Sequence, residues 1–570
     1  MLFETFKRLR NETPDAPAFL ITSGDRSLPI TWRQFTDDID AIAWVVRNHS
    51  QGRSIALLGE NSYEWITGHA ACLFTGACVV PIDVNLTAAE IAERLEFTDA
   101  IALVYSSLHA EKAQEVRKLA PAVVFAGFGT DTTDSFIERG RQAAAGGDSI
   151  WPGEGPGREG EDGRPRTATL VFTSGTTSVP RGAELTLEGI EAFVAYAAAM
   201  LPTKPGQRSL MLLPLHHIFG ICATYFMLSR GVALGICPDF RRIHDAAVRF
   251  RIDFVFLVPA LADILAAKME QHRGPDLEWV LVGGAPLSPR TGTRLRALGV
   301  KALTGYGLTE TSALYSIAPL EGDPHAGSAG KACTMQGVET KVSPEGELLI
   351  RGPNVMKGYF RAPEQTAAVL SKDGWFRTGD MGSIDGDGFV WVKGRGSRTI
   401  VLSSGKKIAP EELEEKLLVS PGVREVVVYG EGESRTVTAE IFSDLPETEV
   451  RAIVAAVNQT LPVYKRIKRV VARRTPFPRT SSGKICYARK PVRTKRRRRG
   501  MEQNWSLILL AALGILALVS AIVSVMPNFL ESQGVLLPPV VKSVFSAFDI
   551  IGEVLLVVFA CLFIFRLRRR

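Results

Sequence analysis

Short apolar runs alternate with helix-like segments over about residues 16–140. The runs SIALLG, ACVVPID and IALVYS have the apolar content of buried strands, whereas LTAAEIAERLEFT carries hydrophobic residues at helical spacing. In that segment Ile91, Leu95 and Phe97 approximate one face of a helix. Strands and helices that alternate along a chain are typical of an α/β fold.

Residues 145–167 interrupt this alternation with a stretch dense in Gly, Pro and charged residues. A stretch of this composition cannot bury a core, so we expect a mobile loop. The alternation resumes in TATLVF, SLMLLPL, FVFLVPA and WVLVGGA, and then passes into a β-rich region at about residues 345–394. We therefore expect a large N-terminal α/β domain with a β-rich subdomain over residues 1–394.

A shorter mixed pattern follows over residues 395–490. A helical segment, PEELEEKLLVS, precedes two strand-like runs, VREVVVYG and TVTAEIF, and a second helical segment, EVRAIVAAVNQTL. This order predicts a small α+β domain of roughly 95 residues.

Two long apolar runs lie near the C-terminus. Residues 505–526 carry no charge, and as a helix rising about 1.5 Å per residue they would extend roughly 33 Å, enough to cross a bilayer core. Residues 544–565 are also apolar but contain Asp549 and Glu553, one helical turn apart. The pattern predicts a transmembrane helical hairpin. Around its helices lie a basic linker at 491–504, an external loop at 527–543 and a basic cytosolic end at 566–570.

The distribution of charge predicts how this hairpin is oriented. The formal net charge is +7, but residues 489–570 hold 13 Lys or Arg against 4 Asp or Glu, so the rest of the chain is nearly neutral. A nucleic-acid-binding domain spreads its cations over a binding face, whereas these cations flank apolar runs. By the positive-inside rule, the main domains lie in the cytoplasm and the hairpin anchors them to the membrane. We expect a lipid bilayer, and no nucleic acid, among the partners.

Composition excludes other classes of protein. A chain with 46% hydrophobic and 22% charged residues is folded and globular, neither disordered nor collagen-like. The seven cysteines are scattered without a CxxC pair, so neither a disulfide framework nor a zinc site is indicated. The first ten residues, MLFETFKRLR, are charged and contain no apolar signal segment, so we expect no secretory signal.

The segment LVFTSGTTSVPRGAELT, at residues 170–186, indicates phosphate chemistry. An apolar strand runs into small and hydroxyl residues that bring backbone N–H groups and side-chain donors to an anion, and Arg181 adds a cation. The small residues are Thr173, Ser174, Gly175, Thr176 and Thr177. Taken alone, the segment is equally compatible with a Ser/Thr-rich surface turn. It is not a P-loop, because Gly483 and Lys484 are followed by Ile485 rather than by Ser or Thr.

Further motifs accompany this segment. Together with TSGTTSVPRG they resemble, in the family's order, the adenylate-forming (AMP-binding) superfamily, and in particular the acyl-CoA synthetases and bacterial long-chain fatty-acid–CoA ligases. The resemblance covers roughly residues 15–490. The motifs are LPLHHIFG (213–220), VGGAPLS (282–288), TGYGLTET (304–311), WFRTGDMG (375–382), KGRGSRTIVLSSGKKIAPEELE (393–414) and FPRTSSGKI (477–485).

The resemblance implies that the chain joins a carboxylate to ATP, releases pyrophosphate and passes the acyl group to CoA, with Mg²⁺ as the metal. It implies that the catalytic residues are Lys484, at the reacting carboxylate, His217, near that carboxylate, and Thr176. It implies metal binding by Glu310 and Thr173. It also implies ATP binding by Thr173, Ser174, Gly175, Thr176, Thr177, Arg181, Gly283, Gly284, Ala285, Gly305, Tyr306, Gly307, Thr309, Asp380 and Arg395.

Individual roles follow from the same resemblance. Tyr306 is expected to stack on adenine, and Thr309 to contact the α-phosphate. Asp380 is expected to bind the ribose hydroxyls with help from Arg395. At the hinge between the two domains, and in the phosphate loop, the chain departs from the usual family residues. The departures are Ser178, Arg181, Ser397 and Arg398.

Two local patterns suggest metal sites that we do not expect. His216 and His217 are adjacent, but neighbours on a strand point to opposite faces and a third ligand is not evident. Residues 385–388, Asp-Gly-Asp-Gly, lack the terminal Glu spacing of a calcium loop, so the pattern predicts a hairpin turn.

The favoured substrate is a medium- to long-chain fatty acid, because a membrane hairpin would hold the enzyme where fatty acids partition. Three alternatives stay open. The substrate could be another carboxylate, the acceptor could be an acyl-carrier protein, or the chain could be a catalytically silent membrane-anchored relative. The sequence does not determine the oligomeric state.

Overall fold

The computed structural model describes most of residues 1–485. The described ranges are 1–23, 26–50, 53–128, 135–144, 149–151, 165–173, 181–201, 203–237, 239–272, 274–320, 327–335, 337–402, 406–432, 435–479 and 485, with five positions between 532 and 543. Met1–Cys486 forms one compact unit and Tyr487–Arg570 a second.

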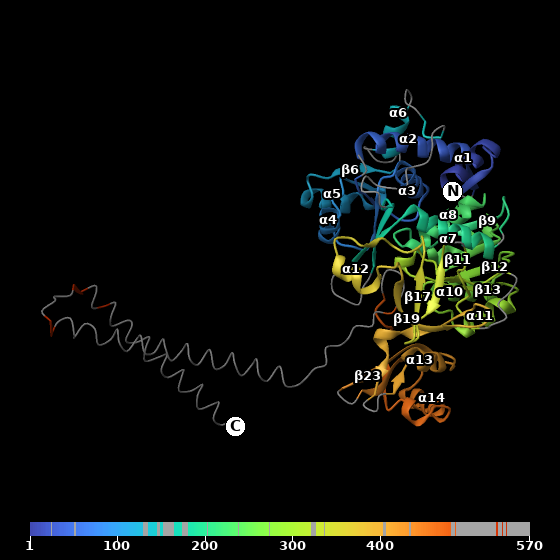
Figure 1. The fold of residues 1–570 in the computed structure, drawn as a ribbon, viewed down its shortest axis with the longest axis vertical. Helices are drawn as coiled ribbons and strands as arrows, with labels where there is room; N and C mark the ends of the chain where they lie inside the picture. Colours follow the sequence, from blue (N-terminus) through green and yellow to red (C-terminus); the bar gives the residue numbers. More distant parts are fainter. Residues whose placement is uncertain are drawn as a thin grey trace. The chain divides into compact units, whose positions relative to one another are not determined.

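A seven-stranded sheet, ordered β18-β8-β7-β4-β3-β5-β6, is built from the apolar runs of the N-terminal region (Figure 1). Its strands β7, β4, β3, β5 and β6 are parallel, and all residues of β3 and β4 are buried. The bounds are β3 Ile55–Leu58, β4 Val79–Ile82, β5 Ala102–Tyr105, β6 Val124–Gly127, β7 Thr169–Thr173, β8 Arg181–Leu185 and β18 Gly358–Tyr359. The predicted α/β architecture is confirmed.

Two further sheets complete the large domain. In one, β11, β12 and β13 are parallel and β14 and β15 continue antiparallel. In the other, β1, β10 and β9 are parallel and β2 pairs antiparallel with β1. The bounds are β1 Pro17–Ser23, β2 Arg26–Thr31, β9 Arg208–Met211, β10 Ala233–Ile236, β11 Phe254–Leu257, β12 Trp279–Val282, β13 Lys301–Tyr306, β14 Ser316–Ile317 and β15 Lys331–Ala332.

Helices cover these sheets and connect their parallel strands. The buried α8, for example, has nearly every residue in the core, which explains why its sequence is apolar on all sides. The bounds are α1 Leu2–Glu12, α2 Trp32–Ser50, α3 Tyr63–Thr75, α4 Ala88–Phe97, α5 Ala110–Leu119, α6 Phe136–Ala144, α7 Leu187–Met200, α8 Ile218–Ser229, α9 Ile243–Phe250, α10 Pro259–Gln271, α11 Pro289–Ala297 and α12 Pro363–Val369.

The predicted helix in LTAAEIAERLEFT is α4, and one of its expected core residues differs. Thr87 and Glu90 form a capping box that begins the helix, and Ile91 and Leu95 are fully buried. Phe97 remains 37% exposed because it packs at the edge of the fold, edge-on to Phe360. Phe97 therefore belongs to a peripheral aromatic group rather than to the buried face.

The loop predicted at residues 145–167 contributes to the core, contrary to expectation. Ile150 and Trp151 are almost completely buried. The Trp151 ring stacks on Phe3 at a centroid distance of 5.3 Å, and its Nε1 donates a hydrogen bond to the Thr36 carbonyl at 3.1 Å. Two large apolar side chains thus anchor a segment whose average composition is that of a loop. Residues 152–164 lie outside the described part.

The β-rich region forms the antiparallel sheet β16-β17-β19-β20, as predicted. Residues 385–388 make the predicted turn between β19 and β20, where the Gly388 N–H donates to the Asp385 carbonyl at 3.1 Å. The bounds are β16 Glu339–Val342, β17 Glu347–Arg351, β19 Phe376–Ile384 and β20 Val390–Arg395.

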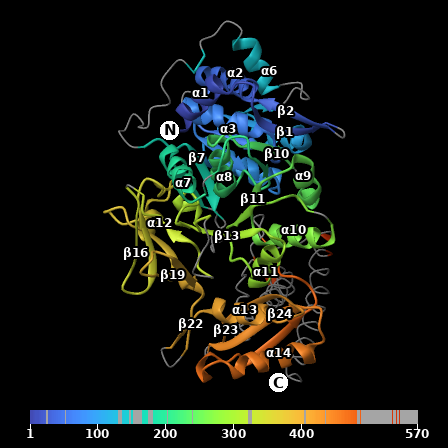
Figure 2. The ribbon, with the colours of Figure 1, turned by 90° about the vertical axis from the view of Figure 1, so that its right-hand side faces the viewer.

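The small α+β domain also forms as expected, with helices packed on the sheet β23-β24-β25 and a two-stranded pair, β21 and β22. Figure 2 shows its orange elements gathered at one end of the first unit, next to α10 and α11. The bounds are β21 Ile400–Val401, β22 Lys407–Ile408, α13 Pro410–Leu418, β23 Val423–Glu431, β24 Thr436–Ser443, α14 Glu447–Gln459 and β25 Arg469–Arg473.

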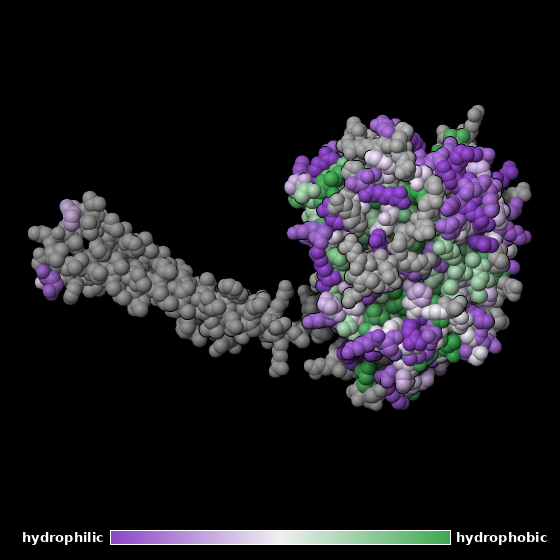
Figure 3. Space-filling model, turned by 45° about the horizontal axis from the view of Figure 1, so that its top comes forward, coloured by the Kyte–Doolittle hydropathy of each residue, from purple (hydrophilic) through white to green (hydrophobic). Residues whose placement is uncertain are grey.

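The described residues include no helix that is both long and apolar enough to cross a membrane. The predicted spans, at 505–526 and 544–565, lie outside the described residues. On the visible face of the first unit, hydrophobic residues occur in small groups between hydrophilic ones (Figure 3).

Candidate active site

The predicted phosphate loop lies between β7 and β8 in the chain. Thr173 ends β7 and pairs with Arg181, which begins β8. The Thr173 hydroxyl donates to the Arg181 carbonyl at 3.4 Å, so the side chain supports the base of the hairpin. Ser174, Gly175, Thr176 and Thr177 lie outside the described residues.

Tyr359 connects the hairpin of β7 and β8 with Glu310. Its strand, β18, pairs with β8 and places Tyr359 opposite Ala183. The guanidinium of Arg181 lies over the Tyr359 ring, 5.4 Å from the centroid, and the Tyr359 hydroxyl donates to Glu310 Oε1 at 2.8 Å. Burial, reinforced by the Glu310 carboxylate, raises the pKa of the Tyr359 phenol. Tyr359 therefore stays protonated and orients the carboxylate predicted to bind metal.

β12 and β13 are parallel neighbours in the five-stranded sheet, so the loops that follow them lie at one edge of that sheet. Gly283 follows β12 directly, and a Cβ there would lie 2.9 Å from the Phe219 ring. Gly284 and Ala285 are exposed, and Gly284 has a φ of +81°. The exposed backbone of Gly284 and Ala285 is open to a planar ligand such as a nucleobase.

Strand β13 ends with Gly305 and Tyr306, followed by Gly307. A Cβ at Gly307 would collide with the Ala313 carbonyl, so only glycine permits this turn. Thr309 and Glu310 then enter a short 3₁₀ helix, Thr309–Thr311, and both are half-buried.

Tyr306, Asp380 and Arg395 form one connected group. Asp380 in β19 pairs with Arg395 in β20 across the antiparallel ladder. Asp380 Oδ2 accepts from the Tyr306 hydroxyl at 2.5 Å, and Oδ1 lies 2.9 Å from Arg395 Nε. Burial, followed by the Asp380 carboxylate, raises the pKa of the Tyr306 phenol. The carboxylate side chain is only 7% exposed, yet its four acceptor positions leave capacity for ligand hydroxyls.

His217 caps the N-terminus of α8, within a turn closed by its N–H donating to the Pro214 carbonyl at 3.1 Å. The expectation that His216 and His217 point to opposite faces is wrong, because they lie in this turn rather than on a strand. Their ring centroids are 4.3 Å apart. His216 Nε2 lies 3.7 Å from Asp83, and burial lowers the pKa of His216. The described residues contain no cluster of three or more metal-ligating side chains.

Asn61 and Tyr359 are positioning residues that the sequence reasoning missed. The Asn61 side chain donates to the Leu213 carbonyl at 2.9 Å and accepts from the Leu215 N–H at 3.1 Å, which holds the turn before His216. Neither residue stands in a pattern with distinctive chemistry. Strand pairing between β18 and β8 brings Tyr359 to the β7–β8 hairpin. The contact between Asn61 and residues 213–215 joins segments that follow β3 and β9, two strands of different sheets.

The predicted residues, together with Tyr359, thus assemble into two linked groups. Arg181, Tyr359 and Glu310 form one, and Tyr306, Asp380 and Arg395 form the other, joined by the short segment from Gly305 to Glu310. His217 borders them through Phe219, whose ring packs against Gly283. The predicted catalytic Lys484 lies outside the described residues.

This arrangement fits a magnesium nucleotide. A single hydrogen-bonded carboxylate, Glu310, suits Mg²⁺, which takes its other ligands from water and substrate phosphates. An aromatic ring, exposed glycine backbone and a buried aspartate supply what a base and a ribose require.

Comparisons with known proteins agree. Residues 6–360 match the model of the AMP-binding enzyme family, and residues 397–493 match the AMP-binding enzyme C-terminal domain. The long-chain-fatty-acid–CoA ligase FadD13 of Mycobacterium tuberculosis is 30% identical over 458 residues, covering 76% of this chain and 87% of that protein. The indoleacetate–CoA ligase of Aromatoleum aromaticum is 30% identical over 455 residues, covering 76% and 86%.

The fold is shared with solved structures. A fatty acyl CoA synthetase of Mycobacterium tuberculosis superimposes with a TM-score of 0.65 at 25% sequence identity, covering 85% of this chain and 96% of that one. Members of the family use ATP, Mg²⁺ and CoA. With both family models matched and the nucleotide-binding groups assembled, the chain belongs to the AMP-binding enzyme family and is an AMP-forming acid–thiol ligase.

Proposed function

We propose that this ligase activates a medium- to long-chain fatty acid as its adenylate and transfers the acyl group to CoA. The observation that carries the fatty-acid assignment is the uncharged run at residues 505–526, because an anchored enzyme meets substrates that partition into lipid. The similarity to a long-chain ligase, FadD13, supports the same substrate class.

We also propose that a C-terminal helical hairpin anchors the protein to the membrane. Residues 505–526 and 544–565 would span the bilayer, with the basic segments at 491–504 and 566–570 on the cytoplasmic side. A cysteine introduced at Ser532 is then expected to react with a membrane-impermeant thiol reagent on intact cells that lack the native thiols. One at Gly500 is expected to react only after lysis. Protection of position 532 before lysis would instead indicate an interfacial segment.

The proposed chemistry divides between two domains, residues 1–394 and 395–490. Arg181 would offset phosphate charge, and the hydroxyls from Thr173 to Thr177 would donate hydrogen bonds to the phosphates. Tyr306 and Asp380 would hold the nucleoside. Glu310 and Thr173 would hold Mg²⁺, which supplies charge neutralisation at the phosphates.

The proposed reaction also requires residues that orient the substrate carboxylate and the α-phosphate. Lys484, from the small domain, would place a cation at the substrate carboxylate and the α-phosphate. His217 would border the acyl entrance, and Thr309 would contact the α-phosphate. No protein nucleophile is required, because the carboxylate itself attacks phosphorus.

A second candidate is a ligase for an aromatic acid, favoured by the equal identity to the indoleacetate ligase. Pyrophosphate release measured over fatty, aromatic and short-chain acids separates the two, with CoA or an acyl-carrier protein as acceptor. We expect the highest kcat/KM with a fatty acid and CoA. An aromatic acid preferred by tenfold or more would replace the fatty-acid assignment. A chain that releases no pyrophosphate with any acid would be a silent relative.

A further inference from the structure

His216 lies between a carboxylate and the ring of His217. Its Nε2 is 3.7 Å from Asp83 Oδ2, and its ring centroid is 4.3 Å from that of His217. The His216 side chain is only 11% exposed, and no group among the described residues forms a hydrogen bond with Nε2, since 3.7 Å is too long for one. A buried imidazole nitrogen thus faces a carboxylate oxygen without being bonded to it.

Asp83 directly follows β4, and its loop holds the carboxylate in one orientation. Oδ1 accepts hydrogen bonds from the backbone N–H and the side-chain Nδ2 of Asn85, both at 2.9 Å. Lys112 Nζ donates to two carbonyls of the same loop, at 2.6 and 2.9 Å. With Oδ1 bound to Asn85, the carboxylate presents Oδ2 to His216. The negative charge beside this histidine is therefore fixed in place.

The backbone that carries His216 and His217 is fixed as well. Asn61 binds residues 213–215 through its side chain, at 2.9 and 3.1 Å. A Cβ at Gly220 would lie 2.4 Å from a carbonyl oxygen of the same turn, so the start of α8 can lie this close to the turn only with glycine there. The remaining freedom is rotation of the two imidazole rings, and each ring limits the rotation of the other.

We propose that His216 is a positioning residue for His217: Asp83 holds the His216 ring, and that ring keeps the His217 imidazole in one orientation at the acyl entrance. An imidazole whose Nε2 carries the hydrogen points that hydrogen at the carboxylate, which attracts it even beyond hydrogen-bonding distance. A side chain held in one orientation acts on the reacting carboxylate without a search over rotamers. The inference rests on the proposed place of His217 at the acyl entrance.

This arrangement makes activity sensitive to the protonation of His216. Asp83, from the loop after β4, and His217, in the same turn, are the titratable groups shown in contact with the ring. Glu60 and His109, which follow β3 and β5, pair with each other at 3.7 Å. Burial lowers the pKa of His216, and the Asp83 carboxylate partly opposes that effect, so the ring is neutral at pH 7. Protonation would draw the ring onto Asp83 and away from His217, and we expect activity to fall as the pH drops below about 6.5.

A double-mutant cycle on the full chain tests the proposal, with kcat/KM measured as pyrophosphate release from the acid that the wild type uses best. His216→Phe keeps a flat ring beside His217 but removes the nitrogen that faces Asp83. We expect kcat/KM for the acid to fall about five- to tenfold while KM for ATP stays within about twofold. His217→Ala should lower kcat/KM at least as much. Adding His216→Phe to it should change the value by less than about twofold, because His216 acts through His217.

The cycle also separates this inference from the proposed function. Full activity in His217→Ala would refute the place of His217 at the acyl entrance, and this inference with it. A loss in His217→Ala with none in His216→Phe would overturn the inference alone, and so would two losses that multiply in the double variant.

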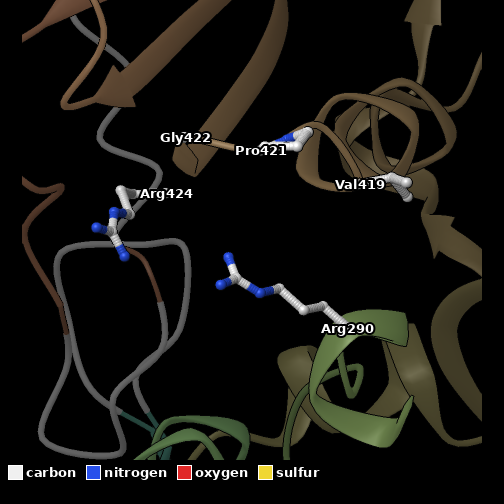
Figure 4. A pocket seen from close by; sticks show the side chains of 5 residues that line it. All are labelled: Arg290, Val419, Pro421, Gly422 and Arg424. Atoms are coloured by element: carbon white, nitrogen blue, oxygen red, sulfur yellow. The ribbon is translucent and has the colours of Figure 1, made fainter. Parts of the chain in front are cut away.

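His109→Phe is the matched control. His109 Nε2 lies 3.7 Å from Glu60 Oε2, the same separation as in the His216 pair, but His109 belongs to a different loop, in the 3₁₀ helix Ser107–His109. We expect its kcat/KM and pH profile to match the wild type. Neither histidine is among the described residues that line the cavity of about 390 Å³ where Figure 4 shows Arg290 and Arg424 pointing into the same open space, so these variants leave that cavity unchanged. Thermal unfolding of each variant shows whether the fold is intact.

Asp83→Asn tests the pair while keeping the shape of both side chains. The amide keeps an acceptor for Asn85 but carries no charge. Removal of the carboxylate lets the pKa of His216 fall further, so the acid limb of the kcat/KM profile should move to lower pH. In His216→Phe the limb should also move to lower pH, because this position no longer titrates. A limb at the wild-type pH in both variants overturns the proposal, and Asp83→Asn decides alone if His216→Phe does not fold.

Discussion

Tyr359 gives two separately predicted residues a common support. Its ring faces the Arg181 guanidinium and its hydroxyl binds the Glu310 carboxylate. A carboxylate that is to bind Mg²⁺ must keep one orientation, and this hydrogen bond provides it without neutralising the charge. Tyr359 therefore acts by restricting the motion of the Glu310 side chain.

Replacing Tyr359 with Phe tests this role. The ring and its contact with Arg181 remain, whereas the hydrogen bond to Glu310 is lost, at a cost of about 0.5–1.5 kcal/mol. We expect kcat/KM for pyrophosphate release to fall roughly two- to tenfold, with a higher Mg²⁺ concentration needed for half-maximal rate. Tyr464→Phe, in the small domain, is the control. An unchanged magnesium dependence in Tyr359→Phe would contradict the orienting role.

His69 illustrates a purely structural effect of a single residue. It is fully buried between the Tyr225 hydroxyl, 2.8 Å from Nδ1, and Thr169, 3.1 Å from Nε2, and burial lowers the pKa of His69 to about 3. The unfolded chain, with an ordinary pKa near 6.5, binds the proton first. Stability is therefore complete above pH 6.5 and is lost as the pH falls from about 6.5 towards 3.

The expected pH dependence is measurable by urea denaturation at pH 7.5 and pH 5.5. One titrating histidine should lower the free energy of unfolding by about 1.4 kcal/mol between these values. His69→Gln replaces the imidazole with an amide that can still form hydrogen bonds but does not titrate, so the difference between the two pH values should shrink by that amount. The same loss in wild type and variant would assign the effect to other groups.

At the level of elements, the connection from β20 to α13 explains a departure from the usual family residues. Arg398, where the family often has Asp, donates to Glu411 at 2.7 Å and to Glu414 at 2.5 Å. Glu414 also accepts from the Val428 N–H at 2.7 Å. The Glu411 carboxylate packs against Gly394, where it leaves no room for a Cβ. Arg398 thus ties the start of the small domain to α13 and β23.

Arg398→Ala should strongly destabilise the small domain. Glu414 is buried, and burial raises its pKa despite the opposing effect of Arg398, so removal of the arginine leaves an unpaired carboxylate. We expect a loss of roughly 3 kcal/mol in chemical denaturation. A carboxyl group whose pKa is higher in the folded than in the unfolded chain stabilises the fold at low pH, and this stabilisation is lost as the pH rises. The loss of stability in Arg398→Ala should therefore be larger at pH 8 than at pH 5. Arg398→Ala with Glu414→Gln should recover part of it.

For the whole molecule, the described residues of the candidate site belong to one compact unit and the C-terminal segment belongs to the other. Unit Met1–Cys486 includes every described residue of the candidate site. Both matched family models lie within residues 6–493. The apolar runs at 505–526 and 544–565 belong to the second unit.

A chain that stops after about residue 490 should therefore retain ligase activity. We expect its kcat for a water-soluble or detergent-dispersed acid to remain within about threefold of the full chain, because the proposed anchor would supply location rather than chemistry. Acyl-CoA formation by both proteins, with and without lipid vesicles, provides the measurement. A truncated protein that folds but has lost activity towards soluble acids would place the C-terminal segment in the active site.

Hydrophobic spacing and local motifs were sufficient to predict the α/β class, the small α+β domain, the turn at 385–388 and the family, because these depend on residues close together in sequence. Tertiary structure alone decided which distant residues touch. The adjacent rings of His216 and His217 differ from expectation because a turn, rather than a strand, holds these two residues. The buried Trp151 and the exposed Phe97 differ because of contacts with distant residues. So do the roles of Tyr359 and Arg398: strand pairing and domain packing bring together groups whose mutual distances no local pattern encodes.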